Sequence, residues 1–416
     1  MRKRAHLFVR GFVQGVGFRP FIYTIAVANG LKGYVLNLGD AGVEALVDGD
    51  EKNIARFLTD LYEKKPPVAC IESVEVEWLP PGDEFRDFNI AKSSERRLTV
   101  RSVIPTDLSI CDCCITDICR ESRWHNYPFT ACAQCGPRFT VTDRLPYDRQ
   151  NTSMRDFPLC TYCDAEFHDP KDRRYDAQGI TCPLCGPHLS LLDKQGTPLE
   201  GDPLTEAAKL LVEGAIMAVK GIGGFHIAVD ASNDAAVMEL RNRRRRLSQP
   251  FAVMSRSLDA VRRYALVGDL EASLMSGVQH PIVVLEKAPC YCLGDSVAPG
   301  LDSIGVMLPY TGIHLLLLDR FGGDALVMTS GNYPGKPISK DNYEALKELK
   351  EIVDYYLLHN RTIVNRCDDS VIKVVDDTPL FLRKSRGYAP SYLSLPWDVQ
   401  DRAVIAVGGE FNINGS

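Results

Sequence analysis

Cys132-Ala-Gln-Cys-Gly-Pro137 recurs in this sequence as Cys182-Pro-Leu-Cys-Gly-Pro187, and each copy follows an earlier Cys-x-x-Cys pair. The unit therefore reads CxxC-x17-CxxC and then CxxC-x18-CxxC. Two thiolates with this spacing can share one metal ion, and two such pairs complete a tetrahedral four-cysteine zinc site. The repeat predicts two structural zinc ions, bound by Cys111, Cys114, Cys132 and Cys135 and by Cys160, Cys163, Cys182 and Cys185.

Disulfide bonds are the main alternative for these cysteines. They belong to oxidising compartments, and no signal peptide precedes the pairs, because Met1 to Arg4 lead directly into an alternating strand pattern. A redox function is also disfavoured, since four pairs recur with matched spacing. We therefore expect a cytoplasmic protein whose paired thiols bind metal.

Length and composition describe a globular protein of several domains. At 416 residues, the chain should hold about three domains of roughly 100–200 residues each. The net charge of −6 gives no general attraction to nucleic acid. No apolar run approaches the roughly 20 residues that cross a bilayer, so a membrane partner is not expected.

The domain pattern predicts a multidomain α+β and α/β fold. Residues 1–91 show strand, helix, strand, strand, helix and strand in turn, which is the ferredoxin-like order. Residues 106–190 hold the cysteine pairs, and residues 200–390 alternate helices with strands, which indicates a mixed α/β sheet. Linkers are expected at 92–105 and at Asp193 to Asp202. Ala403 to Glu410 reads as one buried strand, and residues 403–416 as the start of a further, truncated domain.

A glycine-rich loop, Gln14 to Arg19, lies between the first strand and the first helix. Gly15 and Gly17 let several N–H groups converge at the helix N-terminus, where an anion is favoured, and Arg19 adds a two-pronged donor on a mostly exposed loop. This arrangement predicts a phosphate site, with Asn37 placed to orient a water. The alternatives are a plain strand–helix turn with a surface arginine and an ordinary hairpin asparagine.

A second candidate site lies in the third domain. Five arginines among the six residues from Arg241 to Arg246 could bind a triphosphate, although a solvated helix face would look the same. Thr329, Ser330 and Asn332 follow a predicted strand, and strand ends commonly carry ligand contacts in α/β sheets.

Two resemblances extend this interpretation. Arg10-Gly-Phe-Val-Gln-Gly-Val-Gly-Phe-Arg-Pro20 with Asn37 resembles the acylphosphatase signature, which implies that Arg19 binds the phosphoryl group and Asn37 positions the attacking water. The phosphate-binding loop would comprise Gln14, Gly15, Val16, Gly17 and Phe18. Together with the cysteine repeats and Leu145-Pro-Tyr-Asp-Arg149, this module resembles the hydrogenase-maturation carbamoyltransferases of the HypF family.

The third domain resembles YrdC-like domains in Val219 to Ala231, Leu240 to Arg246, Met328 to Asn332 and Leu382 to Gly387. Such domains bind Mg-ATP and form a mixed anhydride of a carbamate with AMP. The resemblance places the nucleotide and carbamate site on Lys220, Arg243, Arg245, Thr329, Ser330, Asn332 and Arg386. Departures from the family pattern are Gln249, Gly312, Lys336 and His280.

The resemblance implies a three-step activity. Carbamoyl phosphate would be hydrolysed to carbamate, which ATP would convert to carbamoyl-adenylate for transfer to the C-terminal cysteine of the partner HypE. Transfer would need more of the family's C-terminal domain than 403–416. The rival hypothesis is a zinc-ribbon RNA-binding or tRNA threonylcarbamoyl-modification protein, against which the acidic charge and the acylphosphatase signature argue.

Overall fold

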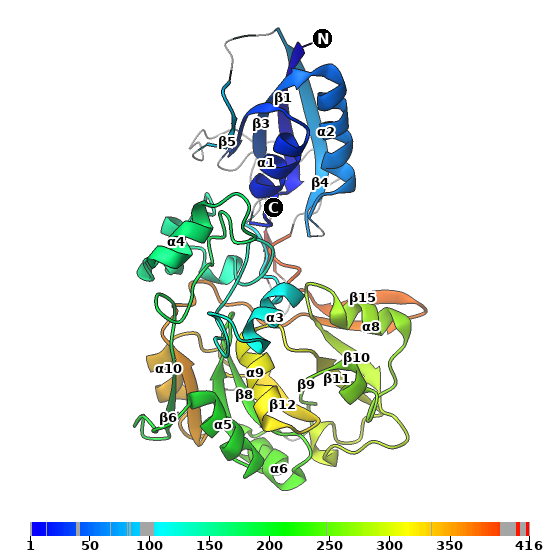
Figure 1. The fold of residues 1–416 in the computed structure, drawn as a ribbon. Coiled ribbons are helices and arrows are strands. Elements are labelled where there is room, and N and C mark those ends of the chain that lie inside the picture. Colours follow the sequence, from blue (N-terminus) through cyan, green and yellow to red (C-terminus); the bar gives the residue numbers. More distant parts are fainter. Residues whose placement is uncertain are drawn as a thin grey trace.

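The computed structural model describes residues 2–13, 15–38, 42–66, 68–80, 82, 85–91, 104–246, 248–333, 335–391, 405–407 and 413–415. Figure 1 shows an N-terminal domain in blue, a cysteine-rich block in cyan and green, and a third domain that continues to orange. The predicted multidomain α+β and α/β fold is confirmed. Residues 92–103 of the first linker lie outside the described residues.

The N-terminal domain has the predicted ferredoxin-like order. Its sheet runs β4-β1-β3-β2-β5, with β1 antiparallel to both β3 and β4 and with the short β5 added parallel to β2. Ala5, Leu7 and Val9 alternate toward the core because successive strand residues face opposite sides. The elements are β1 Arg2–Phe12, α1 Phe18–Ala28, β2 Lys32–Asn37, β3 Val43–Asp50, α2 Glu51–Glu63, β4 Cys70–Leu79 and β5 Phe88–Ile90.

The cysteine-rich block folds as two similar units. In each, a short helix begins directly after the first cysteine: α3 covers Asp112–Cys119 and α4 covers Thr161–His168. Asn126 and Asp176 occupy equivalent places, six residues before the third cysteine, and both have left-handed backbone angles. Three 3-10 turns, η1 Phe139–Val141, η2 Arg149–Asn151 and η3 Ser153–Asp156, join the two units.

The third domain is built on a ten-stranded mixed sheet in the order β15-β14-β10-β11-β9-β12-β8-β7-β13-β6. Its elements are β6 Leu189–Asp193, α5 Pro203–Val212, β7 Met217–Lys220, β8 Phe225–Asp230, α6 Asp234–Arg244, β9 Val253–Ser255, α7 Leu258–Val261, α8 Asp269–Ser276, β10 Ile282–Glu286, η4 Asp295–Val297, β11 Ser303–Met307, α9 Gly312–Phe321, β12 Ala325–Ser330, α10 Asn342–Glu348, β13 Tyr355–His359, β14 Val371–Val375 and β15 Thr378–Arg383.

The two faces of this sheet carry separate cores. On β7, Met217 and Val219 share a core with α5, α9 and the buried cysteines Cys114 and Cys163, whereas Ala218 packs in the core beneath α6 and α10. The cysteine-rich block therefore buries its apolar side chains against the third domain as well as around its own sulfurs.

One predicted boundary needs correction. The third domain was expected to begin at residue 200, but Leu189–Asp193 already forms β6, which pairs antiparallel with β13 at the edge of its sheet. At the other end, one strand was expected from Ala403 to Glu410. Of these residues the structure describes Ile405–Val407, which forms β16 and pairs antiparallel with β17, Ile413–Gly415.

Candidate functional site

The glycine-rich loop turns directly into the N-terminus of α1. Gly15 and Gly17 have φ of 67° and 72°, which favour glycine, and Gly17 is the residue that caps the helix. A side chain at Gly15 would also meet Pro105, and one at Gly17 would touch Ala133. The loop therefore presents main chain rather than side chains at a helix end that favours an anion. Gln14 lies outside the described residues.

Arg19 is buried, and the expectation of a mostly exposed loop is wrong. Only 9% of the residue is exposed, because the cysteine-rich block covers the loop. Its Nη2 lies 3.0 Å from Asp176 Oδ2 and 3.4 Å from Asp148 Oδ1. Burial raises the pKa of Asp176, and the Arg19 charge opposes that rise. Two carboxylates of the block thus hold the guanidinium at the loop.

Asn37 ends β2 and lines the same cavity as Arg19, together with Gly15, Gly17 and Phe18. It is 2% exposed, and its Oδ1 is buried without a hydrogen-bond partner in the described part of the chain. An unpaired buried amide oxygen is costly unless a water or ligand donates to it. Asn37 Oδ1 is therefore placed to accept a hydrogen bond from a water or ligand beside the glycine-rich loop.

The cysteine-rich block supplies the rest of the cavity wall. Arg138 donates from Nε to the Gly15 carbonyl at 2.7 Å, and its other nitrogens donate to the carbonyls of Cys135, Gly136 and Ala133. The Arg138 main-chain N–H and the Thr140 hydroxyl donate to Asp107 Oδ1 at 2.7 and 2.8 Å. Asp107 Oδ2 is unpartnered within the described residues, and burial raises the pKa of this carboxyl.

Sequence reasoning missed Arg138, Asp148 and Asp176 as parts of this site. One signal was available, since the first repeat continues Cys135-Gly-Pro-Arg138 whereas the second continues Cys185-Gly-Pro-His188. Because Arg138 and His188 differ at equivalent positions of the two repeats, the arginine is not required by the Cys-x-x-Cys turn itself.

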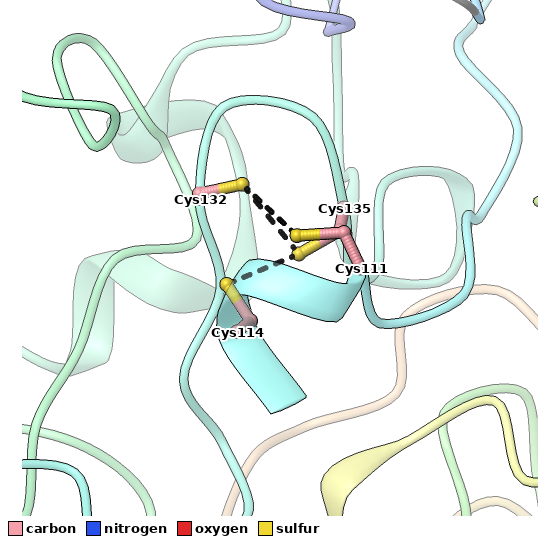
Figure 2. A group of neighbouring side chains, drawn as sticks. All are labelled: Cys111, Cys114, Cys132 and Cys135. Carbon is pink, nitrogen blue, oxygen red and sulfur yellow. Dashed lines mark hydrogen bonds between the residues drawn. The ribbon is translucent and has the colours of Figure 1, made fainter. Parts of the chain in front are cut away.

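The eight paired cysteines form two clusters, one in each repeat, as the spacing predicts. In each cluster the four sulfurs lie within 4.8 Å of one another. Figure 2 shows the first cluster, in which neighbouring sulfurs are separated by 3.6 to 3.8 Å. In the second, Cys182 Sγ lies 3.6 Å from Cys160 Sγ and 3.8 Å from Cys185 Sγ. Tetrahedral Zn–S bonds of about 2.3 Å place sulfurs roughly 3.8 Å apart, so both clusters suit zinc. Four thiolates would leave no open position, which fits a structural ion.

The third domain contains a cavity of about 290 Å³ beside the end of β12, with both apolar and polar side chains in its wall. Thr329, Ser330, Asp369 and Arg246 line it. Arg244 donates to Thr329 Oγ1 at 3.3 Å and to the Ser330 carbonyl at 2.8 Å, and Arg246 donates to Thr329 Oγ1 at 3.3 Å.

Asn332 completes this group. Its Oδ1 accepts from Arg244 at 3.0 Å and from the Ser330 hydroxyl at 2.8 Å. Three of the polar residues predicted for the nucleotide site, Thr329, Ser330 and Asn332, are thus brought together, and two guanidinium groups join them.

The two arginines predicted for this site, Arg243 and Arg245, are not the ones found there. Arg243 pairs with Glu239 and Asp354 at 2.8 and 2.7 Å, and Arg245 is exposed at the left-handed C-cap of α6. Residues three apart share a helix face, so Arg241 and Arg244 turn inward. The helical period after the buried Leu240 was the signal that could have selected Arg244.

Lys220 and Arg386 are both buried and already engaged. Lys220 donates to the His359 carbonyl at 3.0 Å, and burial lowers its pKa to about 8. Arg386 donates to Asp369 Oδ1 at 2.8 Å, while His226 lies 2.8 Å from the other oxygen. These partners hold the pKa of Asp369 below its usual value despite burial. Arg386 therefore fixes a carboxylate in the cavity wall, and Lys220 lies outside the residues that line it.

Three family models match the chain in succession. The Acylphosphatase model matches residues 5–90, the HypF finger model matches 110–142 and 159–192, and the Sua5/YciO/YrdC model, described as "Telomere recombination", matches 209–385. Fold, clusters and matches together define a multidomain enzyme class in which an acylphosphatase domain precedes paired four-cysteine fingers and a YrdC-like domain.

Individual relatives agree over almost the whole chain. The probable carbamoyltransferase HypF of Methanocaldococcus jannaschii is 47% identical over 99% of the chain and 54% of the relative, and the carbamoyltransferase HypF of Rhodobacter capsulatus is 44% identical over 97% and 53%. The chain belongs to the HypF carbamoyltransferase family, and it spans about half the length of the curated relatives it matches.

Solved structures give the same result. A full-length HypF in a phosphate- and nucleotide-bound form matches with a TM-score of 0.89 at 41% identity, covering 94% of this chain and 51% of that one. The HypF of T. kodakarensis matches with a TM-score of 0.87 at 46% identity, covering 95% and 51%. In the described part of the chain, no helix is long and apolar enough to cross a membrane.

Proposed function

We propose that this chain hydrolyses carbamoyl phosphate in its N-terminal domain and activates the resulting carbamate with ATP in its YrdC-like domain. The proposal is carried by one observation: the buried residues Arg19 and Asn37 line the same cavity at the N-terminus of α1. A cation, a helix end and an unpartnered amide oxygen together suit a phosphoryl group and the water that attacks it.

In the first step, water attacks the phosphoryl group, and carbamoyl phosphate becomes carbamate and inorganic phosphate. The loop N–H groups and Arg19 would stabilise the negative charge of the transition state. Asn37 Oδ1 would accept a hydrogen bond from the attacking water and so orient it. Asp148, the more distant of the two carboxylates on Arg19, is the partner that a phosphoryl group would displace more readily.

Carbamate decomposes in water, so the proposal requires a protected passage between the two sites. We infer that this passage runs through the interior of the finger block. Asp107 is buried in this block, and burial lowers the pKa of Arg361 to about 10 while the charge of Asp107 opposes that fall. Arg361 and Lys220 place positive charge on the third-domain side, where an anion would be favoured. Exclusion of water along this path would limit loss of the intermediate.

In the second step, a carbamate oxygen attacks the α-phosphate of Mg-ATP, which releases pyrophosphate and leaves carbamoyl-adenylate. Arg246 and Arg383 line the cavity, and Arg244 bonds Thr329 and Ser330 in its wall. Arg244 and Arg246 would bind the phosphates in place of Arg243 and Arg245. Thr329, Ser330 and Asn332 add hydroxyl and amide groups. Within the family, the product would be transferred to the C-terminal cysteine of HypE during [NiFe]-hydrogenase maturation.

The experiment separates the two steps. Purified protein should release phosphate from carbamoyl phosphate and, with Mg-ATP, should form pyrophosphate and carbamoyl-adenylate, which water hydrolyses to carbamate and AMP. Arg19→Ala should stop both reactions from carbamoyl phosphate but should still form AMP when ammonium bicarbonate supplies carbamate directly. Arg244→Gln should show the reverse pattern, with phosphate release intact and AMP formation lost. Phosphate release that survives Arg19→Ala would contradict the assignment.

A further inference from the structure

The two finger repeats match each other in their charged residues as well as in their cysteines. Arg123 and Arg173 each precede the third cysteine of their repeat by nine residues. Asp117 and Glu166 each follow the second cysteine by three residues. Each repeat therefore carries one arginine and one acid at equivalent places.

These charges pair between repeats. Arg173 of the second repeat donates to Cys114 Sγ of the first repeat at 3.1 Å and to the carboxylate of Asp117. Arg123 of the first repeat donates to Glu166 of the second at 2.7 Å and lies 3.8 Å from Cys163 Sγ. Each arginine thus reaches the second cysteine and the adjacent acid of the other repeat.

The junction between the repeats is also built from equivalent residues. Trp124 and Arg174 both lie eight residues before the third cysteine, and the Arg174 guanidinium stacks 3.6 Å from the centre of the Trp124 ring. Arg123 lies 4.2 Å from the same ring. Arg174 also donates to Asp117. The indole holds one arginine from each repeat, so the crossed contacts form one packed unit.

The arginine contacts lie at buried cysteine sulfurs, where the negative charge of a zinc–thiolate cluster would need a positively charged partner. A zinc ion with four thiolates carries a net charge of about −2, and such charge is costly to bury without hydrogen-bonded partners. Cys114 and Cys163 are both 0% exposed. Groups that hydrogen-bond to metal ligands typically change metal affinity by about 10–100-fold when they are removed. A guanidinium on the buried sulfur is well placed to have such an effect.

We propose that the two finger sites are cross-coupled, so that each metal is retained by the arginine of the other repeat. Each arginine lies in the loop between the second and third cysteines of its own repeat, and metal binding in that repeat closes the loop. Filling one site therefore positions the guanidinium that stabilises the other. Zinc binding should be cooperative, with Arg123 and Arg173 as positioning residues.

The test follows zinc loss separately at each site. Zinc-loaded protein is challenged with a chelator, and the freed cysteines are alkylated over time and identified by peptide mapping. Arg173→Gln should speed exposure of Cys111, Cys114, Cys132 and Cys135 by roughly 10–100-fold and should affect the second cluster less. Arg123→Gln should preferentially expose Cys160, Cys163, Cys182 and Cys185. Arg155→Gln, which removes a finger-block arginine paired with Asp143, is the matched control.

Two outcomes would overturn the proposal. One is that each variant loosens the site of its own repeat, and the other is that Arg173→Gln, Arg123→Gln and Arg155→Gln behave alike. If an arginine variant fails to fold, Asp117→Asn and Glu166→Gln remove the acids that orient the arginines. Native mass spectrometry of unaltered protein at half the required zinc adds an independent measurement. Cooperative filling predicts fewer singly loaded molecules than random filling, and a random distribution would reject it.

Discussion

Arg19 Nη2 and Asp176 Oδ2 lie 3.0 Å apart, and this ion pair joins the phosphate loop of the N-terminal domain to the second finger. The site is therefore assembled from two parts of the chain that are more than a hundred residues apart. The arginine belongs to the acylphosphatase-like domain, and the wall that encloses it belongs to the finger block.

Arg19→Ala is expected to reduce phosphate release from carbamoyl phosphate by roughly 10²–10³-fold, because one donor to the transition-state charge is lost. It should also lower the Tm, since Asp176 would remain buried without its partner. Arg10→Ala, which removes a more exposed ion pair with Glu75, is the control. Near-normal hydrolysis by Arg19→Ala would move the phosphate site elsewhere.

Asn37→Ala should act mainly on kcat and should leave KM nearly unchanged. The amide is proposed to orient water rather than to bind the substrate, and its Oδ1 has no partner among the described residues that would be lost. Steady-state kinetics with carbamoyl phosphate measures both constants. A rise in KM at constant kcat would assign Asn37 to substrate binding instead.

Arg244→Gln should weaken Mg-ATP binding far more than Arg243→Gln does. Arg244 contacts the polar group at the end of β12, whereas Arg243 is committed to Glu239 and Asp354. Calorimetric titration with Mg-ATP compares the two neighbours directly. Gln249→Lys should tighten binding, because it restores the charge usual in the family at an exposed position. Equal losses in the two arginine variants would reject the proposed cavity.

Lys220→Met should raise the Tm most below about pH 8, and the gain should shrink as the pH rises. Burial lowers the pKa of Lys220 from 10.5 to about 8. Between these values the unfolded chain binds more protons than the folded chain, so the stability of the unaltered protein increases with pH. Thermal unfolding across this range, with the exposed Lys209→Met as control, measures the effect. A gain that does not change with pH would contradict it.

Elemental analysis should find two zinc atoms per chain after expression with sufficient zinc. Strong chelation should unfold residues 106–190, because metal binding supplies much of the folding free energy of such segments. Circular dichroism before and after chelation, and after zinc is restored, follows the change. Fewer than one zinc per chain would contradict the two-site assignment.

Local patterns predicted the features that depend on spacing. The cysteine clusters follow from the Cys-x-x-Cys repeats, and the ferredoxin-like order follows from the alternation of residues such as Leu7 and Val9. The phosphate loop was found because Gly15 and Gly17 are required by backbone geometry, which a sequence displays directly.

Features that depend on tertiary packing were not accessible in this way. Arg19 was expected to be exposed because its partners Asp148 and Asp176 are distant in the sequence, and no local pattern indicates that they contact it. The sequence also did not distinguish Arg243 from Arg244, since a run of arginines hides which helical face turns inward. Gly312 shows the same dependence on distant neighbours: a side chain there would collide with the Pro128 carbonyl of the finger block.

The position of β6 determines where the finger block and the YrdC-like domain can be separated. The strand follows Cys185 by only a few residues, and it completes the edge of the ten-stranded sheet by pairing with β13. A cut placed in the expected linker, between Asp193 and Asp202, would therefore strip an edge strand from the YrdC-like domain and leave β13 open to pair with other molecules. Truncations meant to isolate that domain should begin before Leu189, and those that begin at Pro203 should aggregate more readily.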